Sequence, residues 1–91
     1  MFDHKIIVKK IDEVLHLTKN ALTKDLIEDI STCAHCGEET IAFENLCSNL
    51  YEYEPPISRQ AYELLKDIGL SLNVEKRRWK VLESQIRSEN S

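Results

Sequence analysis

Two adjacent prolines, Pro55 and Pro56, constrain the fold of this 91-residue chain more than any other feature, and they are its only prolines. A proline has no backbone N–H and disfavours helical geometry in the residue before it, so a helix that reaches this pair must end there. Apolar residues at helical spacing lie between Glu38 and Glu52. The sequence therefore predicts a helix over residues 38–52 that ends in a sharp turn.

Apolar residues at helical spacing also occur on both sides of this turn. They predict a helix over residues 2–17, a second from the N-cap Thr23 to Gly37, another from the N-cap Ser58 to about Gly69, and a last one capped near Asn73. We expect residues 86–91 to be flexible. No stretch alternates apolar and polar residues as a strand does. The predicted fold is all-α: one compact domain over residues 1–91, a bundle of four to five helices.

The charge of the chain is unevenly distributed. The net charge is −4, but residues 38–67 carry seven acidic against two basic side chains, a net charge of −5. An acidic middle segment repels a phosphate backbone, so we expect no direct nucleic-acid binding and a basic protein as partner. No run of about 18 apolar residues exists, and the N-terminus lacks the pattern of a signal peptide. We therefore expect no membrane segment and a cytoplasmic location.

Three cysteines and a histidine form the strongest candidate for metal or redox chemistry: Cys33, His35, Cys36 and Cys47. A C-x-x-C pair with a further thiolate or imidazole could ligate zinc. However, no second such pair exists, and Cys47 falls at a core position of the helix predicted over residues 38–52. Free cysteine packs as a small apolar residue. We therefore expect ordinary thiols and no metal or other cofactor.

Other chemical motifs are missing from the sequence. There is no nucleophile elbow, no H-E-x-x-H pair and no glycine-rich phosphate loop, and a chain with two glycines can hardly build such a loop. The basic run Lys76-Arg77-Arg78 precedes Trp79, which shares helical spacing with Leu82 and is expected in the core rather than stacked on a base. We expect no catalytic residues and no enzymatic activity.

One block of the sequence resembles a known family. The stretch L-C-S-N-L-Y-E-Y-E-P-P-I-S at residues 46–58, followed by A-Y-E-L-L, I-G-L-S-L and W-K-V-L, is similar to the MafI-type bacterial immunity proteins. Members of that family show an L-C-x-x-L-Y-E-Y stretch, a proline-containing turn, a helix with a spaced glycine and a late tryptophan. The match covers residues 38–83, while the first 37 residues match nothing that we can name.

The resemblance implies an immunity protein that protects a bacterium from a toxin delivered by its neighbours, as in contact-dependent growth inhibition. The partner would be the C-terminal toxin domain of a large exported protein. Several partners of this family are ribonucleases of the EndoU type, some of which cleave tRNA. An acidic helical protein can occupy a basic RNA-binding groove by presenting carboxylates where phosphates would lie. The resemblance supplies no contact residues.

The predicted toxin-binding residues lie in the stretch at residues 44–58, which is rich in carboxylates and contains two tyrosines. They are Glu44, Ser48, Tyr51, Glu52, Tyr53 and Glu54. The three glutamates would mimic phosphates. Because Tyr51 and Tyr53 point in different directions on a helix, we expect one of them to anchor the turn in the core and the other to face outward at the interface.

Two other classes of function stay open on the sequence alone. One is a small helical adaptor or regulator that binds a protein other than a toxin, which the gene neighbourhood would distinguish. The other is a metal-binding redox sensor built on Cys33, His35, Cys36 and Cys47, which predicts stoichiometric zinc in the purified protein.

Overall fold

The computed structural model describes residues 3–87. Over this range the chain forms five α-helices and one 3-10 helix: α1 (His4–Leu17), α2 (Lys24–His35), α3 (Glu39–Tyr53), α4 (Arg59–Ser71), α5 (Lys76–Lys80) and η1 (Val81–Gln85). The same residues contain no β-strand; a single isolated bridge pairs Ile57 with Ile86. The predicted all-α bundle is confirmed.

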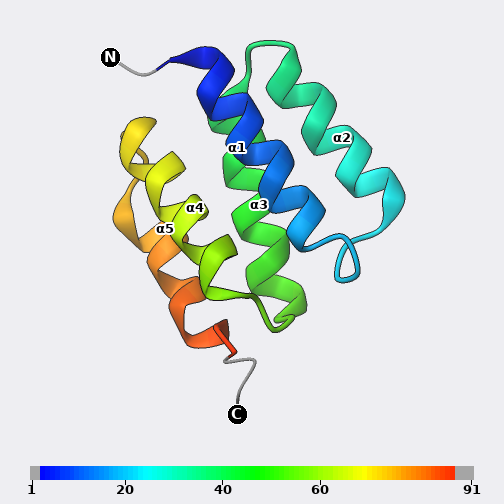
Figure 1. Cartoon of the computed structure of the whole chain (residues 1–91), viewed down its shortest axis with the longest axis vertical. Helices are drawn as coiled ribbons and strands as arrows, with labels where there is room; N and C mark the ends of the chain where they lie inside the picture. Colours follow the sequence, from blue (N-terminus) through cyan, green and yellow to red (C-terminus); the bar gives the residue numbers. More distant parts are fainter. Residues whose placement is uncertain (1–2, 88–91) are drawn as a thin grey trace.

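Helices α1 and α3 occupy the middle of the bundle (Figure 1). Helix α2 packs against both of them on one side, whereas α4 packs against α1 on the other side. Helix α5 and η1 complete the fold by covering α3, and α5 also packs against α4. The C-terminal part of the described chain therefore lies between two helices that follow one another in the sequence.

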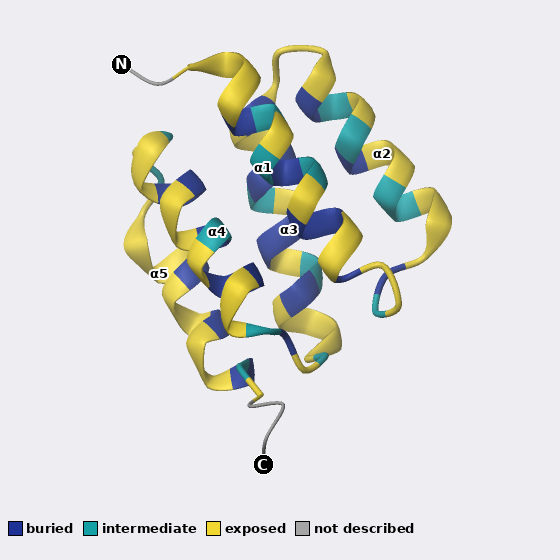
Figure 2. Ribbon diagram, in the orientation of Figure 1, coloured by how far each residue is buried: buried dark blue, intermediate teal, exposed yellow. Residues whose placement is uncertain are grey.

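Buried side chains line the faces of the helices that meet inside the bundle (Figure 2). The core residues predicted on the helix before the prolines are all buried, namely Ala42, Phe43, Leu46, Cys47 and Leu50. Trp79 and Leu82 are buried as predicted, and Trp79 packs edge-on against Tyr62 with ring centroids 6.3 Å apart. The apolar pattern on the first helix is confirmed only in part, because Ile6 is 52% exposed and Phe2 lies outside the described residues.

Most helix ends agree with the local sequence signals. Thr23 caps α2 by accepting a hydrogen bond from the Leu26 N–H at 3.2 Å, and Ser58 caps α4 by accepting from the Ala61 N–H at 3.0 Å. Gly37 follows the end of α2 with a φ of +89°, a conformation that favours glycine. The carbonyl of Cys33 accepts from the Glu38 N–H across this turn at 3.1 Å. These three predictions of helix boundaries rest on short-range chemistry, which explains their accuracy.

The prediction that Gly69 loosens or ends the fourth helix is wrong. Helix α4 continues to Ser71, and Gly69 is buried within it. A Cβ at this position would lie 2.2 Å from Cδ1 of Trp79, so glycine is present because the indole packs directly on the helix backbone. The cap of the last helix, predicted at Asn73 or a neighbour, lies two residues further along the chain. Asn73 instead leaves α4 with a φ of +59°, and Glu75 is the N-cap of α5.

The expected flexibility of residues 86–91 is wrong for its first two residues. The Ile57 N–H donates to the Gln85 carbonyl and the Arg87 N–H donates to the Ile57 carbonyl, each at 3.0 Å. These bonds form the bridge that joins the C-terminal segment to the turn after α3. Residues 88–91 lie outside the described residues.

Candidate functional site

The predicted toxin-binding residues lie on α3 and immediately after it. Ser48, Tyr51, Glu52 and Tyr53 are exposed on the helix, while Glu44 is half-buried. Glu54 is exposed at the helix end, where its φ of +50° reverses the chain into the two prolines. The structure therefore places five of the six side chains where a protein partner could reach them.

Neither tyrosine of the pair anchors the turn, so that part of the prediction is wrong. Tyr51 is 56% exposed and Tyr53 is 60% exposed. The turn is held from inside by apolar residues that precede and follow the pair, Leu50 and Ile57, both of which are buried. Both phenol groups are thus available at the surface.

Gln85 fixes the end of α3 in place. Its buried side-chain Nε2 donates to the Leu50 carbonyl at 2.9 Å and to the Pro55 carbonyl at 3.1 Å. Together with the bridge at Ile57, these bonds hold the turn that carries Glu52, Tyr53 and Glu54. Gln85 was not among the residues predicted from the sequence. The available signal was its position three residues after Leu82, on the same side of the helical turn as the core residues.

A groove of about 350 Å³ separates the exposed side of α3 from α5. Its lining residues are Cys47, Ser48, Tyr51, Arg77, Arg78 and Val81. Two predicted residues, Ser48 and Tyr51, therefore share one groove, whereas Glu52, Tyr53 and Glu54 lie beyond it at the helix end. Arg77 and Arg78 line the groove from α5. Their location bounds the acidic surface on its α5 side.

The Cys47 thiol lies at the bottom of this groove and is 2% exposed. Burial raises its pKa from 9.0 to about 12, and the neighbouring Glu44 carboxylate adds to the shift while Arg78 opposes it. A thiol with such a pKa remains protonated at neutral pH and is a poor nucleophile or metal ligand. Cys47 thus acts as a core residue.

Cys36 is free and exposed, whereas Cys33 and His35 have separate partners. The Cys33 Sγ donates a hydrogen bond to the Glu38 carboxylate at 3.5 Å. Burial of the thiol raises the Cys33 pKa most, and the Glu38 carboxylate raises it further. The His35 Nε2 lies 2.7 Å from the Asp12 carboxylate on α1. In the part of the chain that the structure describes, no three His, Cys, Asp or Glu side chains form a group that could hold a metal ion. The arrangement gives the redox-sensor hypothesis no support.

His4 forms a second histidine–carboxylate pair at the other end of α1. Its Nδ1 lies 2.7 Å from the Glu39 carboxylate, which is 96% buried at the start of α3. The His4 and His35 pairs lie along a groove of about 510 Å³ between α1, α2 and the start of α3. Both pairs join helices to one another, which is a structural role.

Comparison of the chain with protein-family models, with curated proteins and with solved structures finds no significant match. Searching residues 3–87 for membrane spans likewise reveals no helix with the length and apolar character to cross a bilayer. The similarity to MafI-type immunity proteins therefore stays a prediction from the block at residues 46–58.

Proposed function

We propose that this chain is a cytoplasmic immunity protein, which neutralises a bacterial toxin domain by binding it and performs no reaction itself. The observation that carries the proposal is the exposed pair Tyr51 and Tyr53 beside Glu52 and Glu54 at the end of α3. Tyrosine supplies a large contact area and a polar hydroxyl at little cost in side-chain entropy, and it is common among the residues that dominate binding energies. Both rings are displayed on a rigid helix end.

The charge of this surface supports a basic partner. Three of the seven acidic residues in the 38–67 segment lie on α3 or at the end that carries the tyrosines, and are exposed or half-buried: Glu44, Glu52 and Glu54. A ribonuclease must offer a basic groove to RNA, and carboxylates on a rigid helix can occupy that groove. The proposed partner is accordingly an EndoU-type ribonuclease, including those that cleave tRNA.

The rigidity of the turn also supports binding at this place. Because Gln85 and the bridge at Ile57 hold the turn after α3, its side chains lose little conformational freedom when a partner docks. The side chains of a flexible loop would lose more conformational freedom on binding. The end of α3 is thus suited to present the tyrosines and glutamates to a partner in a fixed arrangement.

The decisive test is co-expression with the toxin domain encoded directly upstream of this gene. Cells that carry the toxin should survive with the wild-type protein and die with the double variant Tyr51→Ala/Tyr53→Ala. The matched control is Ile6→Ala on α1, which removes an equally exposed apolar side chain outside the proposed surface and should protect fully.

Death of the cells with the wild-type protein would refute the immunity function. If no toxin domain is encoded nearby and the protein instead copurifies with a regulatory partner through Tyr51 and Tyr53, the adaptor hypothesis replaces it.

A further inference from the structure

Helices α3 and α5 carry opposite charges and pack against one another. Helix α3 and the residue that ends it contain no lysine or arginine, and their acidic side chains are Glu39, Glu44, Glu52 and Glu54. Helix α5 contains four basic side chains and no acidic one. Within residues 3–87, no salt bridge joins the two helices. The charges of each helix are therefore open to a partner that brings the opposite charge.

Only two of the cations of α5 line the groove between α3 and α5. They are Arg77 and Arg78, since Lys76 and Lys80 line the groove with α4. Arg77 pairs with Glu75 at 3.1 Å, but both side chains are largely exposed, and such surface pairs are weak. Arg78 is exposed and forms no salt bridge in the part of the chain that the structure describes. Arg78 is thus the cation best placed to pair with another molecule.

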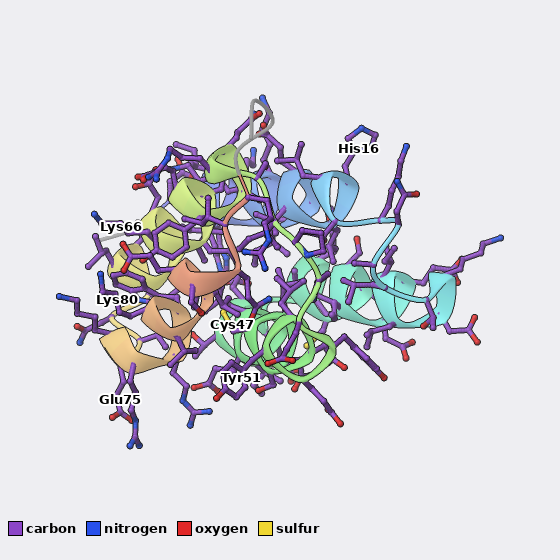
Figure 3. The ribbon with its side chains drawn as sticks, turned by 90° about the horizontal axis from the view of Figure 1, so that it is seen from below. His16, Cys47, Tyr51, Lys66, Glu75 and Lys80 are labelled. Carbon is purple, nitrogen blue, oxygen red and sulfur yellow. The ribbon has the colours of Figure 1, made fainter. Side chains whose placement is uncertain are left out.

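Exposed apolar surface lies on both sides of the same groove. Tyr51 on α3 is 56% exposed, and Val81, which follows α5, is 42% exposed. Figure 3 shows Tyr51 on the same side of the molecule as Glu75, the N-cap of α5. Burial of this apolar surface against a partner would be favourable.

The order of these groups follows from how α5 and η1 run along α3. Arg78 lies near Cys47 in the groove, whereas Gln85 bonds to carbonyls at the end of α3 and beyond it. The two segments therefore run in the same direction. Glu44 also lies near Cys47, but it is half-buried. Along the surface, which we call the α3–α5 face, the order is Arg78, then Tyr51 and Val81, then Glu52 and Glu54.

We propose that the α3–α5 face binds a second copy of this chain in an isologous dimer. A twofold axis through the apolar centre places Arg78 of each copy over the glutamates at the end of α3 in the other copy. The two apolar centres then meet at the axis. This pairing brings opposite charge to both ends of the face, whereas a uniformly basic partner would repel Arg78.

The dimer and the proposed toxin complex share Tyr51, Glu52 and Glu54. Dimerisation needs no toxin, so the inference does not rest on the immunity function and can fail or succeed separately from it. Where both hold, the toxin domain binds the monomer and dissociates the dimer.

Sedimentation velocity of the full-length protein alone tests the proposal. We expect a reversible monomer–dimer equilibrium with a dissociation constant on the order of 100 μM, as for small transient interfaces. Concentrations should extend about ten-fold to either side of this value. High salt should weaken the dimer about five-fold, because the charges at both ends of the face are exposed.

Charge reversal at either end of the face should weaken the dimer about ten-fold, because attraction is replaced by repulsion. The variants are Arg78→Glu and Glu52→Lys/Glu54→Lys. The second of these brings the net charge from −4 to zero, which by itself would favour association. Lys24→Glu, at an exposed position of α2, is the matched control for Arg78→Glu and should dimerise as the wild type does. Thermal unfolding confirms that each variant is folded.

A mixture of the two charge-reversed variants distinguishes the dimer from a general effect of charge. In a heterodimer of Arg78→Glu with Glu52→Lys/Glu54→Lys, opposite charges again meet at both ends, so we expect affinity close to that of the wild type. Adding Tyr51→Ala to both variants should weaken the heterodimer about ten-fold, since it removes the aromatic contact at the centre.

Four results would overturn the proposal. They are a wild-type protein that stays monomeric, a series of oligomers that grows beyond the dimer, Arg78→Glu dimerising as the wild type does, and a mixture of the variants that forms no heterodimer. A protein that is monomeric alone, but whose Arg78→Glu variant binds the toxin domain more weakly, would assign the α3–α5 face to the toxin instead.

Discussion

The contact between Gly69 and Trp79 shows how one residue determines the packing of two helices. The indole lies where a side chain at position 69 would begin, with Nε1 2.4 Å and Cδ1 2.2 Å from the Cβ position. Glycine costs helix stability relative to alanine, by about 1 kcal/mol in an exposed helix interior. Here the cost is offset because the glycine lets α5 approach α4 closely enough to bury the tryptophan.

Gly69→Ala should therefore destabilise the protein although alanine is the better helix former. We expect a loss of about 1–3 kcal/mol in the free energy of unfolding, as found when side chains are forced into packed cores. Urea unfolding, monitored by tryptophan fluorescence, measures this loss of stability. Ser71→Ala, at an exposed position of the same helix, is the control and should change stability little. Equal stability of Gly69→Ala and the wild type would contradict the close packing.

The buried thiol of Cys47 should resist alkylation. At pH 8, iodoacetamide should modify the exposed Cys36, while Cys47 should react only after unfolding in urea, because burial raises its pKa to about 12. Mass spectrometry of peptides identifies the modified residue. Alkylation of Cys47 at the rate of Cys36 in the native protein would contradict the structure.

The same pKa shift predicts how Cys47 contributes to stability as pH changes. Its pKa is higher in the folded chain than the ordinary value of 9.0. The contribution of this thiol is therefore fully present below pH 9 and is lost as the pH rises towards 12. Cys47→Ala should abolish that component of the alkaline loss of stability, which urea unfolding at a series of pH values would reveal.

At the scale of the elements, the end of α3 is defined by residues far apart in the sequence. Pro55 and Pro56 prevent the helix from continuing, but they do not decide the direction of the chain after it. That direction depends on Gln85, whose side chain reaches the carbonyls of Leu50 and Pro55. The 3-10 helix η1 places Gln85 against the turn, so the last described element positions the candidate surface.

Gln85→Ala should loosen this turn. The Pro55 carbonyl would lose the donor that the structure gives it, at a cost of about 1–2 kcal/mol in the free energy of unfolding. The backbone amides of Tyr53, Glu54 and Ile57 should also exchange hydrogen faster. The matched control is Gln60→Ala, since Gln60 is exposed and bonds only to Glu13. Unchanged stability and exchange in Gln85→Ala would show that the prolines alone hold the turn.

At the scale of the whole molecule, the chain is compact, and its acidic and basic side chains are concentrated on different parts of the surface. The radius of gyration is 12.0 Å, the value expected for a compact domain of about this length. The short helix α5 separates two environments: Arg77 and Arg78 border the groove with α3, while Lys76 and Lys80 line the groove with α4. The acidic surface at the end of α3 is therefore bounded by the cations of α5.

Reversing the charge of this acidic surface should slow binding to the toxin domain. For Glu52→Lys/Glu54→Lys we expect the association rate to fall about ten-fold at low salt, with a smaller effect at high salt, because exposed charges act mainly by steering. Surface plasmon resonance at two salt concentrations measures the association rate. The control, Glu28→Lys/Asp29→Lys, changes the net charge equally on the exposed side of α2. An equal slowing in both variants would indicate a nonspecific effect of net charge.

Sequence alone determined the all-α class, the approximate bounds of the first three helices, the N-caps at Thr23 and Ser58, the glycine after α2 and the core residues before the prolines. Each depends on neighbours within one or two helical turns. The tertiary structure decided that Gly69 lies inside a helix, that both Tyr51 and Tyr53 stay exposed, that Gln85 holds the turn, and that Arg77 and Arg78 border the candidate surface. These features depend on contacts between segments that are distant in the sequence. Rules based on local periodicity and helix capping carry no information about such contacts.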